Sequence, residues 1–224
     1  MTDVRLRTLE RRWRETGASA DHACYLVERL RTGELPVERA RLAAYLGDAA
    51  AREALGIVAE TEAASQRAWA AGLHAWRDPV PARVALAAAR AVLPVFDRGL
   101  NPDPRPRRAL RAGEACVVCP CEAHAARAAT ASEDAEAIAT DDAGTAVWAA
   151  VRASFGQSVP ERPSSESART TASRWNDLLE TAVVAAGRVA GVVAVRSAVR
   201  DAVVPWALKY DDPLARRMGR SSGS

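Results

Sequence analysis

The stretch that decides the fold runs from Leu86 to Arg127 and reads LAAARAVLPVFDRGLNPDPRPRRALRAGEACVVCPCEAHAAR. Alanine, leucine and arginine fill both of its ends, and these residues have high helix propensities. The middle, Asn101–Arg107 (NPDPRPR), holds three prolines, which restrict the backbone, and Asn101 or Asp103 can cap the amides of a following helix. The stretch therefore predicts helices joined by a short, rigid turn.

Composition extends this prediction to the rest of the chain. Alanine accounts for 51 of the 224 residues and aromatic residues for only 5%. Long alternating runs of β-branched residues, which are typical of strands, are nearly absent. We therefore expect an all-α protein, a multi-helix array of antiparallel α-hairpins that is solenoid-like or an irregular bundle, with no significant β-sheet.

Glycines divide the first part of the chain into short helical segments. Each apolar-periodic segment is followed by a glycine, which favours a helix end. The predicted ends lie at Gly17, Gly33, Gly47 and Gly56, and Asp48 is expected to cap the fourth helix.

Longer helices are expected further along the chain. Ile57–Trp76 reads as one helix, and Ala82–Asp97 as another that Pro94 bends or ends early. Glu133–Phe155 holds one helix or two, with Gly144 as a joint. Ala168 to about Val204 reads as one long helix.

These segments predict five regions. They are N-terminal helical hairpins (1–56), an alanine-rich helical core region (57–155), a Ser/Pro-rich linker (156–167), a C-terminal long helix packing on the core (168–210) and a tail (211–224).

Charge and hydropathy limit the classes of partner. Thirty-one basic and 28 acidic residues leave a formal net charge of only +3, which does not favour a nucleic-acid binder. The charged N-terminus lacks the apolar core of a secretory signal, and no apolar run is long enough to span a membrane. We expect a cytoplasmic protein that binds neither nucleic acid nor membrane.

Four residues of the types that bind metals, Cys116, Cys119, Cys121 and His124, lie close together in the sequence. Thiolates and an imidazole suit a tetrahedral zinc site, although a structural site usually draws its ligands from two separate places. A redox dithiol is disfavoured, because no strand–helix pattern precedes Cys116. We favour a third interpretation, in which these cysteines are small buried hydrophobic side chains and no cofactor is bound.

The basic turn also allows two interpretations. Arg105, Arg107 and Arg108 can pair with acidic residues of the same chain, or these arginines and Asp103 can face a protein partner. Internal pairing is the simpler interpretation, because ion pairs on protein surfaces are common.

A family resemblance rests on two segments, Val92–Phe96 (VLPVF) and Asp103–Leu110 (DPRPRRAL), between alanine-rich helices. Over residues 82–155 the chain resembles a family of immunity proteins from bacterial polymorphic toxin systems, which carries a D-R-P-R-x-A-I turn. The resemblance implies an all-α fold and the binding and neutralisation of a toxin. Pro104 and the cysteines depart from the family pattern.

The chain carries no sequence motif of a known catalytic site. It contains no G-x-S-x-G, H-E-x-x-H, Walker or G-x-G-x-x-G sequence. We therefore predict a non-enzymatic α-helical protein-binding module, and an immunity protein is the form that the resemblance suggests. A zinc-binding helical protein is the alternative.

Overall fold

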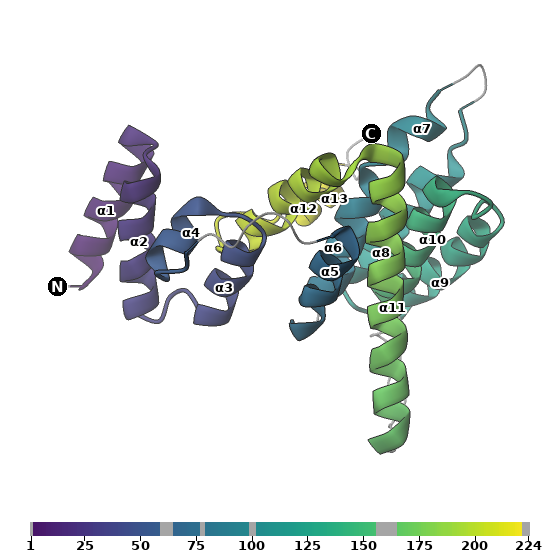
Figure 1. Cartoon of the computed structure of the whole chain (residues 1–224), viewed down its shortest axis with the longest axis horizontal. Helices are drawn as coiled ribbons and strands as arrows, with labels where there is room; N and C mark the ends of the chain where they lie inside the picture. The colour runs from purple at the N-terminus through teal and green to yellow at the C-terminus, as the bar shows by residue number, and fades with distance from the viewer. Residues whose placement is uncertain (1, 59–64, 77–78, 99–101, 156–164, 221–224) are drawn as a thin grey trace. The chain divides into compact units, whose positions relative to one another are not determined.

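The computed structural model describes residues 2–58, 65–76, 79–98, 102–155 and 165–220. Within these ranges every regular element is a helix and no strand occurs, which confirms the all-α prediction (Figure 1). The chain divides into two compact units, residues 1–62 with 203–212 and residues 63–202 with 213–224.

The first unit contains short helices that end beside glycines. They are α1 (Thr2–Thr16), α2 (Ser19–Arg31), α3 (Val37–Tyr45) and α4 (Ala49–Ala54). The predicted ends are confirmed, because each helix is followed within two residues by a glycine with positive φ, namely Gly17, Gly33, Gly47 or Gly56. The cap is confirmed too, since the Asp48 side chain accepts a hydrogen bond from the Ala51 amide at 2.7 Å.

Residues 203–212 complete this unit through aromatic contacts. The ring of Tyr210 lies 5.0 Å from that of Trp13, measured between centroids. Trp13 in turn stacks on His22 at 4.2 Å, and the hydroxyl of Tyr210 lies 2.7 Å from Nε2 of His22. A segment from near the C-terminus therefore belongs to the core of the N-terminal hairpins.

The second unit contains the alanine-rich helices. They are α5 (Gln66–Gly72), a 3₁₀ turn (Leu73–Ala75), α6 (Val80–Arg90), α7 (Leu93–Phe96), α8 (Arg105–Val118), α9 (Glu122–Glu136), α10 (Asp142–Phe155), α11 (Ser165–Ala190) and α13 (Pro213–Arg220). Helix α12 (Val192–Ala207) contributes residues to both units.

Helix α6 lies at the centre of the second unit. All its residues from Val80 to Ala89 are buried, and it packs against α8, α10 and α11. Five of the ten buried residues are alanines, whose small side chains let helix backbones approach closely. Gly113 of α8 extends this packing, because a Cβ there would lie 3.0 Å from Leu86 and 2.9 Å from the hydroxyl of Ser154.

The prediction of one helix from Ile57 to Trp76 is wrong within the described residues. Helix α5 begins at Gln66, where the Ser65 hydroxyl accepts a hydrogen bond from the Ala68 amide at 3.1 Å. This cap fixes a helix start inside the predicted segment. Residues 59–64 lie outside the described residues.

The long C-terminal helix is also two helices. Gly191 separates α11 from α12 with a φ of +86°, a conformation that an α-helix cannot contain. The apolar pattern of the sequence continues across this position, and only the backbone angle of Gly191 shows that the helix is broken there. Pro205 lies inside α12 and does not end it.

The other predicted boundaries shift by a few residues. Pro94 lies in α7, after α6 has ended at Arg90. Gly144 lies in the first turn of α10, where its amide donates to the Asp141 side chain at 2.8 Å. The predicted linker falls mainly on residues 156–164, outside the described residues, and much of the predicted tail is helix α13.

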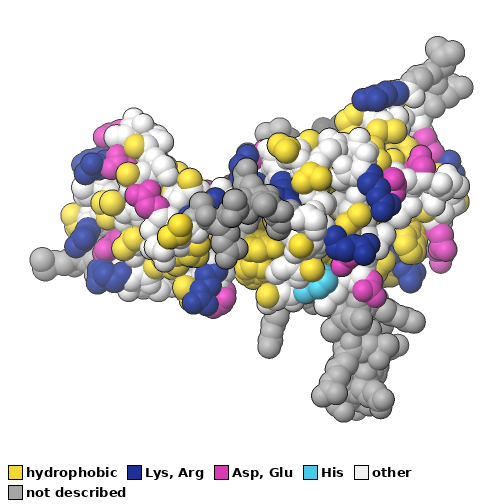
Figure 2. All heavy atoms as spheres, viewed as in Figure 1, with side chains coloured by type: hydrophobic (Ala, Val, Ile, Leu, Met, Phe, Trp, Pro, Cys, Tyr) yellow, Lys and Arg dark blue, Asp and Glu magenta, His cyan; other side chains and the backbone are white. Residues whose placement is uncertain are grey.

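The visible surface carries a mixture of charges. Basic and acidic side chains are interspersed on the face in Figure 2. Among the described helices, none has the length and apolar character that would be needed to cross a bilayer.

Candidate functional site

Both candidate sites predicted from the sequence lie at the ends of helix α8. At its N-terminus, Asp103 accepts a hydrogen bond from the Arg105 amide at 2.9 Å. The same carboxylate pairs with the Arg105 side chain, with 2.7 Å between Oδ2 and Nη2. The Arg105 side chain and then its amide lower the pKa of Asp103, so this carboxylate caps the helix in its charged form.

Arg107 is also paired within the chain. Its Nε donates to Oδ1 of Asp97 at 3.0 Å, and this pairing links α8 to the residue that follows α7. The hydrogen bond from Arg107 lowers the pKa of Asp97. Two of the three predicted arginines therefore have an acidic partner on the same surface.

Arg108 and Arg111 differ from these two residues. Both are exposed, and no ion pair or hydrogen bond joins either side chain to another residue that the structure describes. They lie three positions apart on α8, so they share one face of the helix. With Arg105 and Arg107 of the same helix they form what we call the basic face.

The C-terminal end of α8 carries the thiols. The Cys121 amide donates to the Cys119 carbonyl at 2.8 Å, which closes a three-residue turn around Pro120. The fixed φ of proline suits the central position of such a turn. Cys119 caps the end of α8 and Cys121 caps the start of α9, so the turn holds two exposed thiols on adjacent helix ends.

His124 lies beside these thiols in the first turn of α9. Its Nδ1 is 3.1 Å from the sulfur of Cys121 and 3.1 Å from the carbonyl oxygen of Cys119. Together Cys119, Cys121 and His124 offer two sulfurs and one ring nitrogen that all lie within 4.8 Å of one another. We call these three residues the thiol–imidazole cluster.

The two thiols of the cluster differ in acidity. Hydrogen bonding from the His124 amide, at the N-terminus of α9, lowers the pKa of Cys121. The neighbouring Cys121 thiol raises the pKa of Cys119. Cys121 is therefore the first of the pair to become a thiolate.

Cys116 is not part of the cluster. It is fully buried and packs with Ala125, Ala128 and Phe155. The structure thus brings together three of the four predicted ligands and places the fourth, Cys116, in the hydrophobic core. The prediction that the cysteines of this segment are buried is confirmed for Cys116 and wrong for Cys119 and Cys121, which lie at exposed helix ends. Cys24, the remaining cysteine, is exposed on α2.

A buried acid near the middle of α8 was missed by the sequence analysis. Glu114 is 2% exposed and accepts hydrogen bonds from Arg90 of α6, at 2.7 Å and 2.8 Å, and from Arg217 of α13, at 3.1 Å. Its position among alanines on the apolar side of α8 is the sequence signal that could have found it.

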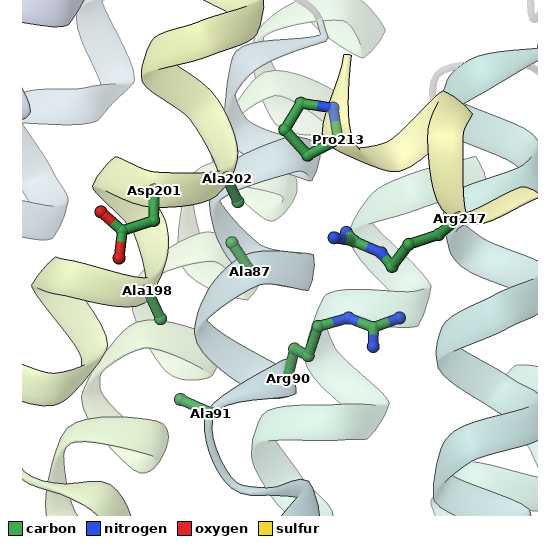
Figure 3. Close-up of a pocket in the computed structure, with 8 residues that line it drawn as sticks. All are labelled: Ala87, Arg90, Ala91, Ala198, Asp201, Ala202, Pro213 and Arg217. Atoms are coloured by element: carbon green, nitrogen blue, oxygen red, sulfur yellow. The ribbon is translucent and has the colours of Figure 1, made fainter. Parts of the chain in front are cut away.

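A pocket of about 270 Å³ lies beside this ion-pair network. Figure 3 shows Arg90 and Arg217 on one side of it and Asp201 on the other. The remaining lining consists of Ala87, Ala91, Ala198, Ala202 and Pro213. Because both guanidinium groups already bind Glu114, the pocket offers little beyond a small apolar surface.

No family model matches the chain, and comparisons with curated proteins and with solved structures find no similar protein. The support for a function of the thiol–imidazole cluster or of the basic face therefore comes from the geometry of each site alone.

Proposed function

We propose that this protein is a non-enzymatic protein-binding module that uses the basic face of α8 to bind an acidic protein surface. The observation that carries the proposal is the exposure of Arg108 and Arg111 without a bonded acidic neighbour among the described residues. Residues 97–111 hold five arginines and two aspartates, an excess of three positive charges that equals the formal net charge of the whole chain.

The local ion pairs support this use of the face. Arg105 and Arg107 are held in place by Asp103 and Asp97. Side chains that are ordered before binding lose less conformational entropy when a partner binds. Arg108 and Arg111 remain available for bidentate hydrogen bonds to carboxylates, and arginine is one of the residues most often found in binding hot spots.

The family resemblance favours a toxin domain as the partner, and a cytoplasmic location belongs to the same proposal. The test uses the purified effector domain encoded beside the gene of this protein. The dissociation constant of the complex between this effector domain and the protein is measured for the wild-type chain and for the double variant Arg108→Glu/Arg111→Glu. We expect affinity to fall about 100-fold or more, because two hot-spot charges are reversed.

The matched control is Arg11→Glu/Arg14→Glu on α1. It makes the same change in net charge at two exposed arginines whose ion pairs lie at the surface. If both double variants lowered the affinity equally, the effect would be due to net charge alone. The basic face would then not be the binding surface. Failure of the wild-type chain to bind the effector or to protect cells from it would overturn the immunity form.

A further inference from the structure

We propose that Cys119, Cys121 and His124 form a three-ligand zinc site at the junction of α8 and α9. This inference goes beyond the protein-binding function and does not depend on it. The site would take a thiophilic divalent ion, and its ligands follow one another at spacings of two and three residues.

The ligand atoms are already gathered. In a tetrahedral site with zinc–sulfur bonds near 2.3 Å and zinc–nitrogen bonds near 2.0–2.1 Å, ligand atoms lie about 3.5–3.8 Å from one another. The two sulfurs and the ring nitrogen of the cluster all lie within 4.8 Å of one another, and Nδ1 of His124 is 3.1 Å from the sulfur of Cys121. Rotations of the side chains alone can therefore bring the three atoms to bonding positions.

The backbone holds this arrangement in place. The turn around Pro120 fixes Cys119 relative to Cys121 through the hydrogen bond between their backbones. The first turn of α9 then places His124 three residues later, on the same side as Cys121. Because Cys119 and Cys121 are exposed, adjusting them disturbs no core packing.

The chemistry of the donors selects the metal. Two thiolates and an imidazole suit zinc, whereas magnesium and calcium require oxygen ligands. Three protein ligands leave the fourth position for water or for a donor from outside the cluster. Cys116 does not fill this position, because its side chain packs among Ala125, Ala128 and Phe155.

The test measures metal binding to the full, reduced chain. Co²⁺ is titrated first, because thiolate ligation produces a near-ultraviolet charge-transfer band and tetrahedral geometry produces a strong visible band. Zn²⁺ is then added to displace it. We expect one equivalent of Co²⁺ to bind and one equivalent of Zn²⁺ to remove both bands.

Variants assign the ligands. Cys119→Ser, Cys121→Ser and His124→Ala should each weaken Zn²⁺ binding about 100-fold or more, since each removes one of the few ligands. Cys24→Ser removes an exposed thiol outside the cluster and should change nothing. Cys116→Ala tests the buried thiol and should also retain binding, with circular dichroism checking that each variant keeps its helices.

The outcomes separate the alternatives. Sub-stoichiometric binding by the wild-type chain, or equal loss in Cys24→Ser, would show adventitious thiol binding and overturn the proposal. Loss of binding in a folded Cys116→Ala variant would overturn the three-ligand site. Retention of tight binding in His124→Ala would remove the imidazole from it.

Discussion

Both units of the molecule contain a buried charged side chain that binds a C-terminal segment of the chain, but the partners of that charge differ between the units. In the first unit, Arg29 of α2 is 6% exposed and donates to the carbonyl oxygen of Leu208 at 2.7 Å. In the second, Glu114 is 2% exposed and holds Arg217 of α13 as well as Arg90.

The difference lies in the partners. Glu114 faces two guanidinium groups, so removing it leaves two cations in a largely buried place. Arg29 faces a carbonyl and the rings of Tyr25 and Tyr210, at 5.5 Å and 5.2 Å, and its nearest carboxylate, Glu34, is 4.0 Å away. Aromatic faces stabilise a cation without needing to be charged themselves. We therefore expect the removal of Arg29 to cost less stability than the removal of Glu114.

The largest expected effect is that of Glu114→Ala. Removing the shared acid should lower the free energy of unfolding by about 3–5 kcal/mol, because two partly buried cations lose their counter-charge. Chemical denaturation followed by circular dichroism measures it. Glu136→Ala, at an exposed acid on α9, is the control and should have little effect. A loss below about 1 kcal/mol would mean that the network is not buried in solution.

Arg29→Ala should have the next largest effect. The variant loses a charged hydrogen bond and two cation–π contacts, which together predict about 2–4 kcal/mol of destabilisation. Arg29→Lys keeps the charge but not the planar guanidinium, so it should recover part of this loss. If Arg29→Ala destabilises the protein more than Glu114→Ala, the comparison is reversed.

Acid should weaken the first unit in a smaller, graded way. Burial lowers the pKa of His22 from its ordinary 6.5, Asp48 opposes this shift and Arg29 adds to it. The unfolded chain then binds a proton at a higher pH than the folded chain. His22 therefore contributes stability that is present above pH 6.5 and is lost as the pH falls from there towards the lowered pKa of the folded state.

Thermal unfolding measured across this range checks the prediction. The melting temperature of His22→Gln should vary less with pH than that of the wild type just below pH 6.5. An unchanged pH slope in the variant would assign the acid sensitivity to another group.

The smallest effect is expected where the charge is exposed. Asp97→Asn removes the partner of Arg107 on the surface, where water screens the ion pair. The melting temperature should barely change. A large loss would show that the surface pair orders the N-terminus of α8, and would make exposure a poor guide to these interactions.

The sequence predicted those parts of the fold that depend on local residue chemistry. Gly17, Gly33, Gly47 and Gly56 mark helix ends because few other residues adopt a positive φ easily. Asp48 caps α4 for a similarly local reason. The helix break at Gly191 was not predicted, because the apolar residues on both sides continue a helical pattern. The positive φ that breaks the helix leaves no periodic signal in the sequence.

The candidate sites were predicted in part. The spacing in the sequence was enough to place Cys119, Cys121 and His124 close together. Cys119 and Cys121 flank a tight backbone turn, and His124 lies in the first helical turn that follows it. Cys116 lies only three residues before Cys119, yet it points to the core, and the packing of α8 against other helices decides this. Glu114 could not be paired with Arg90 and Arg217 in advance, since its partners lie 24 and 103 residues away.

The division of the chain has a consequence for its biosynthesis. Residues 203–212 belong with residues 1–62, and the chain then returns to the second unit for α13. The N-terminal helices are made first, but Leu208 and Tyr210 leave the ribosome only after residues 63–202 have been made. The first unit must therefore wait, with the binding positions for these residues exposed to water, until that whole intervening segment has been synthesised.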